Sequence, residues 1–123
     1  MILQSLPEIR AAVNTMNPVA RLAAQTFGGI LIENPSLGED MEKVREACQR
    51  AIVHAFAQSH DVDDPSFPEA FMSFVNDHAP AIWDVGVSIA LYAAKEQQRK
   101  QTWGWLGTAA AVGVGAILGA IFS

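Results

Sequence analysis

LGEDMEKVREACQRAIVHAFAQSH, residues 37–60, is the stretch that decides the fold class. Its apolar residues recur three or four positions apart, the spacing of one helical face, at Leu37, Met41, Val44, Cys48, Ile52 and Phe56. Charged residues cover the opposite face. The pattern predicts an amphipathic helix over 37–60 that turns one side toward a core.

Three S-x-x-E sequences mark expected helix starts, at Ser5–Glu8, Ser36–Glu39 and Ser66–Glu69. In such a capping box the serine oxygen accepts the backbone N–H three residues on, and the glutamate reaches back to the serine N–H. Helices are therefore expected to begin near residues 6, 37 and 67.

Proline and glycine divide the first part of the chain. Asn17-Pro18 ends one helix and begins another, because asparagine is a good N-cap and proline fits the first helical position. The pair Gly28-Gly29 is typical of a helix end. These signals predict two short helices over 6–16 and 18–27.

Turn and proline signals also divide the chain after residue 60. Residues 61–66 predict a turn, and a helix over 67–78 is expected to stop before Pro80. A further helix runs from about residue 80 through Ala94 and can continue into the tail. No sustained alternation of apolar and polar residues predicts a strand. The expected fold class is all-α, a small bundle of four to five helices.

Charge is unevenly placed along the chain. All 8 Lys and Arg residues and all 13 Asp and Glu residues precede residue 101, and the formal net charge is −5. No extended basic surface is left to neutralise phosphates, so nucleic-acid binding is not expected. The chain divides into a soluble acidic helical domain, residues 1–100, and a C-terminal hydrophobic helix, residues 101–123.

The tail contains WGWLGTAAAVGVGAILGAIF, residues 103–122, without an ionisable side chain. As a helix this length covers roughly the 30 Å hydrocarbon core of a bilayer. Trp103 and Trp105 suit the membrane interface, and Arg99 and Lys100 before them place the N-terminal domain in the cytoplasm. The tail is thus predicted to be a transmembrane tail anchor in a single-pass protein. The alternative is a helix buried within a soluble assembly.

Small residues form a stripe at four-residue intervals along the tail: Gly107, Ala111, Gly115, Gly119 and Ser123. In lipid, such residues let helix backbones approach closely. The expected partners of the tail are the lipid bilayer and either a second copy of the chain or another membrane helix.

Motifs that carry chemistry are absent from the sequence. His54 and His60 lack the i, i+4 spacing of a metal pair, and the single Cys48 lies on the apolar face of its helix. No phosphate-binding loop, nucleophile elbow or zinc motif is present. We therefore expect no catalytic residues, no cofactor and no metal.

Asp84 interrupts the apolar run 80–94. One interpretation is a switch, since protonating or pairing this carboxylate would let the segment enter a bilayer. The other is that Asp84 lies at the solvent edge of an ordinary amphipathic helix.

The expected function rests on this architecture. It is that of a non-enzymatic, tail-anchored structural or adaptor subunit of a cellular or viral membrane-associated assembly, whose acidic domain engages other proteins. One alternative is a membrane-permeabilising protein, such as a phage holin or ejection component or a pore-forming regulator of cell death. Thr108 is the only polar residue between Trp105 and Ser123, which argues against a water-filled single-helix pore. A third alternative is a soluble assembly subunit with the tail buried between copies.

Overall fold

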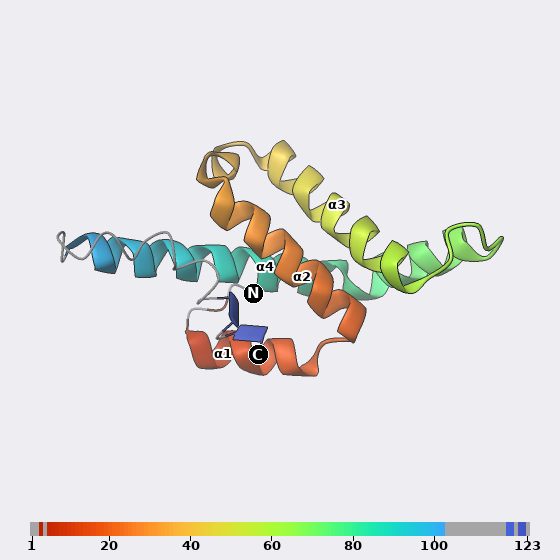
Figure 1. The fold of residues 1–123 in the computed structure, drawn as a ribbon, viewed down its shortest axis with the longest axis horizontal. Helices are drawn as coiled ribbons and strands as arrows, with labels where there is room; N and C mark the ends of the chain where they lie inside the picture. The colour runs from red at the N-terminus through yellow and green to blue at the C-terminus, as the bar shows by residue number, and fades with distance from the viewer. Residues whose placement is uncertain (1–2, 4, 103–117, 120, 123) are drawn as a thin grey trace.

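The computed structural model describes residues 3, 5–102, 118–119 and 121–122, with the side chains of 97–102 excepted. Within these residues the chain is all-α, as predicted, with no strand. Its elements in chain order are α1 Leu6–Thr15, α2 Pro18–Glu33, the 3₁₀ helix η1 Pro35–Glu39, α3 Met41–Ser59 and α4 Phe67–Thr102 (Figure 1).

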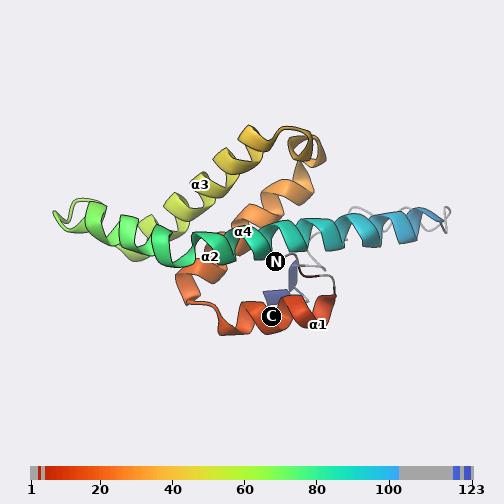
Figure 2. The same cartoon turned by 180° about the vertical axis from the view of Figure 1, so that it is seen from behind.

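Helix α2 is the centre of the bundle. It packs against α4 along one side and against α3 along another, while α1 packs on α4. Figures 1 and 2 show α4 running the length of the molecule and extending past the other helices at its C-terminal end. Every other helix is therefore positioned relative to α4 or to α2.

The predicted N-caps Ser5 and Asn17 are confirmed. The Ser5 hydroxyl oxygen accepts the Glu8 N–H at 3.4 Å at the start of α1. The Asn17 side-chain oxygen accepts the Val19 N–H at 2.8 Å at the start of α2. The angle between these helices arises because Pro18 cannot continue α1. The start of α4 at Phe67 and the turn before it are also confirmed.

The predicted start near residue 37 is wrong. Residues 35–39 form η1, and α3 begins only at Met41. The cap is Asp40, whose carboxylate accepts the Glu42 N–H at 3.0 Å. Aspartate is as strong an N-cap as serine, so the chain has two competing start signals four residues apart. Leu37 consequently lies outside the helix whose apolar face it was predicted to join.

The predicted end of the second helix at Gly28-Gly29 is also wrong, because α2 continues through Glu33. Neither glycine has the positive φ of a helix-ending residue. Gly28 serves close packing instead: a β-carbon there would lie 3.1 Å from Cγ2 of Ile89 on α4. Gly28 therefore allows α2 to pack closely on α4, and the glycine pair does not end a helix.

The predicted break at Pro80 does not occur, since α4 is one helix of 36 residues with Pro80 inside. Proline removes only the hydrogen bond to the Asn76 carbonyl, and both residues are exposed, where water can replace it. Packing supports both halves. Phe56 of α3 contacts the ring of Phe74 before Pro80, and Ile82 is fully buried beyond it.

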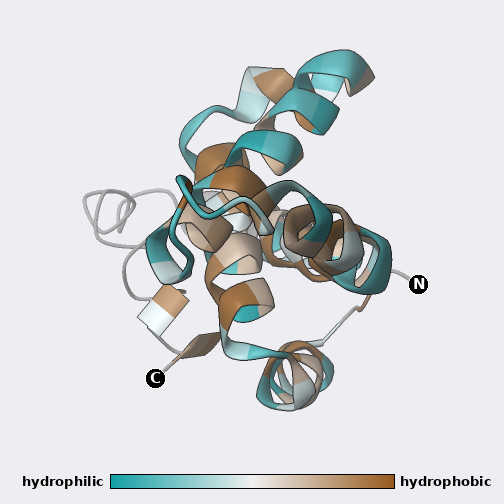
Figure 3. Cartoon of the chain, turned by 90° about the vertical axis from the view of Figure 1, so that its right-hand side faces the viewer, coloured by the Kyte–Doolittle hydropathy of each residue, from teal (hydrophilic) through white to brown (hydrophobic). Residues whose placement is uncertain are grey.

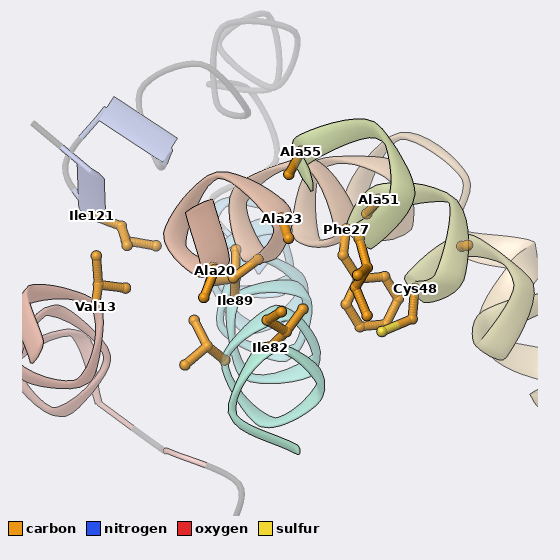
Figure 4. Close-up of a cluster of buried hydrophobic side chains, with 14 of the residues drawn as sticks. Val13, Ala20, Ala23, Phe27, Cys48, Ala51, Ala55, Ile82, Ile89 and Ile121 are labelled. Carbon is orange, nitrogen blue, oxygen red and sulfur yellow. The ribbon is translucent and has the colours of Figure 1, made fainter. Parts of the chain in front are cut away.

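Most of the core lies where α2, α3 and α4 meet, and Ile9 and Val13 of α1 and Ile121 extend it (Figure 3). It combines small residues, such as Ala20, Ala23 and Ala51, with a few large ones, of which Phe27 and Phe56 are fully buried. Figure 4 shows Phe27 among side chains of all three helices. The alanines allow the helix axes to approach, and the phenylalanines fill the space that remains.

Candidate functional site

An apolar pocket of about 400 Å³ opens between the C-terminal end of α2, η1, the start of α3 and the middle of α4. One wall consists of Leu31, Ile32, Pro35, Gly38, Met41 and Val44. The other wall is α4, with Trp83, Val87, Ala90, Leu91, Ala93 and Ala94. This volume lies in the lower part of the range of ligand pockets, about 300–1,000 Å³.

The 3₁₀ helix η1 connects α2 to α3 at this end and supplies part of the lining. Asn34 ends α2, with its backbone N–H bonded to the Ile30 carbonyl at 3.0 Å, and η1 then separates the two helices. In the α4 wall, the Trp83 ring packs against Phe27, with ring centroids 5.6 Å apart. Because Phe27 is fully buried, the indole rests on a rigid support.

Large hydrophobic residues are exposed at the mouth of the pocket. Met41 is 55% exposed on one wall and Leu91 is 48% exposed on the other. Met41 was predicted to face the core, but the late start of α3 leaves it at the edge. Exposed apolar side chains that line one continuous pocket are typical of a surface that binds another apolar group.

No lining residue of the pocket is charged, but the chain segments that supply the lining contain more acidic than basic residues. Residues 31–44 contain Glu33, Glu39, Asp40 and Glu42 but only one basic residue, Lys43. Asp84 is the one charged residue in the other segment, residues 83–94. Glu42 forms an ion pair with Arg45 at 3.3 Å. With Arg45 included, the segments that supply the pocket have a formal charge of −3.

A second apolar contact involves the end of the chain. Ile121 is only 2% exposed and belongs to the core, and Leu118 and Phe122 pack against it. Figure 4 shows the Ile121 side chain beside Val13 of α1. Leu118 lies over α2, where its Cδ1 is 3.7 Å from the position that a β-carbon on Gly29 would take. Leu118 therefore lies against α2, and Ile121 lies against α1.

The predicted tail residues are only partly described. Gly107, Ala111, Gly115, Ser123, Trp103 and Trp105 lie outside the described residues. Gly119 is helical and exposed, and a β-carbon there would have no neighbour within 4 Å. Arg99 and Lys100 belong to the last turns of α4. Among the residues that the structure describes, no helix is long and apolar enough to cross a membrane.

Asp84 lies between the pocket residue Trp83 and the buried Val85, and it is half-buried. Its backbone carbonyl accepts the hydroxyl of Ser88 one turn later. Ser88 is fully buried, and its oxygen also accepts the backbone N–H of Leu3 at 2.8 Å. The turn that contains Asp84 therefore ties the N-terminal residues to α4.

The histidines and the cysteine have structural partners. His60 stacks on Phe56 with ring centroids 3.9 Å apart, and a ring nitrogen of His54 lies 2.8 Å from the Gln58 amide nitrogen. Cys48 is buried on the apolar face of α3, as predicted, and burial raises the pKa of its thiol to about 11. A neutral thiol at physiological pH is a weak nucleophile.

The apolar pocket was not predicted from the sequence. Its residues come from four elements and read individually as core positions. Only the clustering of acidic residues at 33–42 distinguished one wall. Ser88 was missed for the same reason, because a serine within an apolar run carries no sign of a partner 85 residues away.

No protein-family model, curated protein or solved structure matches the chain. The features of the molecule that bear on function are therefore the apolar pocket, the packing of Leu118 and Ile121, and the uncharged composition of residues 103–122.

Proposed function

We propose that the protein is a non-enzymatic, tail-anchored adaptor of a membrane-associated assembly. Residues 103–123 enter the bilayer, and the acidic helical bundle binds another protein. The observation that carries the adaptor role is the open mouth of the apolar pocket, where Met41 and Leu91 are each about half exposed. Val53, Val62 and Met72 are equally exposed elsewhere, but of these side chains only Met41 and Leu91 adjoin a continuous apolar pocket that a partner could fill.

The membrane anchor is supported by composition. Residues 103–122 carry no charge and have the length of one bilayer crossing. The packing of Ile121 on the bundle fits the same proposal, because an apolar tail needs cover whenever it is outside lipid. Docked and inserted tails are then two states of one chain.

Carbonate extraction of membranes tests the anchor. In the tail variant, Val112→Lys and Val114→Lys interrupt the apolar run and leave residues 118–122 unchanged. Each lysine near the bilayer centre costs about 3 kcal/mol of insertion free energy. The matched control carries Val53→Lys and Val62→Lys, which add the same charge at sites 48% and 58% exposed on the bundle.

We expect the wild type and the control to remain in the carbonate-resistant pellet and the tail variant to become soluble. Leakage of dye from liposomes by the wild type would replace the adaptor role with membrane permeabilisation. A wild-type protein that stays soluble in the presence of membranes would refute the anchor.

The second candidate function is a soluble assembly subunit whose tail packs in protein. The observation that favours it is that Ile121 is buried beside Val13 of α1, so this part of the tail packs on protein. Sedimentation equilibrium of a soluble wild type distinguishes the two, because this candidate requires a defined oligomer that the two tail lysines dissociate.

A further inference from the structure

We propose that the apolar pocket between α2, η1, α3 and α4 binds one amphipathic helix of a partner protein, with the apolar face of that helix in the pocket and basic residues along its edges. The inference rests on the proposed adaptor role and names the chemistry of the partner.

The shape of the pocket fits a helix. Its α4 wall runs from Trp83 to Ala94, about 16 Å or three helical turns. A helix of three turns presents apolar residues at i, i+3 or i+4, and i+7 on one face, which is the pattern that grooves of this kind recognise. The half-exposed Met41 and Leu91 stand on opposite walls, so the mouth admits side chains from outside.

The apolar lining of the pocket favours a helical backbone in the partner segment. Aliphatic side chains and Trp83 form the walls, and the helices that carry them already use their backbone groups in their own hydrogen bonds. An extended peptide would bury unpaired N–H and C=O groups against such walls. A helix satisfies these groups internally, so it is the one regular structure that can cover this surface without that cost.

The acidic residues in the segments that form the pocket favour basic residues in the partner helix. Five carboxylates and one lysine lie in residues 31–44 and 83–94, and Arg45, which pairs with Glu42, leaves a formal charge of −3. Lys or Arg beside the apolar face of the partner would complement these carboxylates. A second copy of this chain, with a net charge of −5, would bring mostly like charge. The uncharged tail, residues 103–117, would gain nothing from them.

Trp83 is the expected anchor. Its ring already packs on the buried Phe27 at a centroid distance of 5.6 Å, so little conformational freedom is left to lose when a partner covers it. Preorganised aromatic residues at the centre of an interface carry much of its binding energy.

Fluorescence of Trp83 tests the inference. Trp103→Phe and Trp105→Phe in the full-length chain leave Trp83 as the sole tryptophan. The probe is a synthetic helix of about 16 residues, roughly 24 Å long, with leucine on one face and lysine on the other. The control peptide has glutamate in place of every lysine. Both titrations use the same buffer, with a mild non-ionic detergent if the chain requires one.

We expect the lysine peptide to shift the Trp83 emission and to bind at least about tenfold more tightly than the glutamate peptide, with the difference shrinking at about 0.5 M salt. Leu91→Lys at the mouth should weaken binding of the lysine peptide by at least about tenfold. Met72→Lys is the matched control, since Met72 is 56% exposed on the same helix but outside the pocket. Both sites are exposed, so circular dichroism should show that both variants stay folded.

Equal affinity for the two peptides, or binding that Leu91→Lys does not weaken, overturns the inference. A dimer that Leu91→Lys dissociates would make a second copy the occupant and overturn it as well. So would peptide binding that occurs only after residues 103–117 are replaced by a glycine-serine linker, because the tail would then be the occupant. The titration does not depend on membrane insertion. If the chain binds the lysine peptide but is released from membranes by carbonate, this inference stands and only the membrane anchor is refuted.

Discussion

Gly86 of α4 faces the ring of Phe27 of α2 so closely that a β-carbon at residue 86 would collide with Cδ2 and lie 2.9 Å from Cε2 of the ring. The two helices cross at this point because one of them has no side chain. Phe27 in turn supports Trp83. The contact therefore links the core to the apolar pocket.

Gly86→Ala should destabilise the fold. Overpacking a buried ring costs up to about 3 kcal/mol, and alanine returns about 1 kcal/mol of helix propensity, so we expect a net loss of about 2 kcal/mol. Gly38→Ala is the control, because nothing lies within 4 Å of a β-carbon there. Urea denaturation measures both. Equal stability of the two variants would show that Phe27 moves aside without cost.

Ile121→Asp should release the end of the chain, because the carboxylate would be buried at a site only 2% exposed. Hydrogen exchange should then accelerate at the amides of Ile9 and Val13 in α1. Gly119→Asp adds the same charge two residues away, where the position is exposed, and should leave the exchange unchanged. Unaltered exchange in both variants would argue that residues 118–122 do not cover α1.

Ser88→Ala should cost about 1 kcal/mol, since it removes the acceptor of the Leu3 N–H. The Leu3 amide should lose its protection from hydrogen exchange. Ser73→Ala on the exposed side of the same helix should have little effect or stabilise slightly. If Leu3 exchanges rapidly in the wild type, this hydrogen bond does not hold the N-terminus.

The Cys48 thiol should make stability depend on pH above neutrality. Burial raises its pKa to about 11, whereas an unfolded thiol has a pKa of about 8.5. The native state then binds this proton more tightly, so the contribution is fully present below about pH 8.5 and is lost as the pH rises toward 11. Urea denaturation of the wild type and Cys48→Ala between pH 7 and about 11 isolates this term. A difference in stability between the two proteins that does not change with pH would refute it.

The helix predictions that proved correct rest on interactions between residues that are close in sequence. Ser5 and Asn17 cap helices through backbone groups two or three residues away, and the apolar face of 44–56 repeats within one helix. The errors came from residues whose effect depends on another helix. Gly28 packs against Ile89 and does not end α2, and Pro80 remains within α4 because both sides of the helix are packed.

Some features of the candidate site were visible in the sequence, and others depend on the tertiary structure. The uncharged tail and the acidic stretch 33–42 are properties of composition and were visible in the sequence. The pocket needed Met41 and Leu91, which are 50 residues apart, to be placed on facing walls. No local pattern encodes such a distance, because loop lengths and helix crossings determine it.

The sequence by itself determined an all-α chain with an acidic bundle and an uncharged end, because caps, amphipathic periodicity and charge act between near neighbours. Only the tertiary structure decided that two glycines bring α2 against α4, that Ile121 lies on α1, and that an apolar pocket stays open beside Trp83. The physical reason is that packing satisfies all contacts of a core at once, so the role of each small or apolar residue depends on which distant side chain it meets.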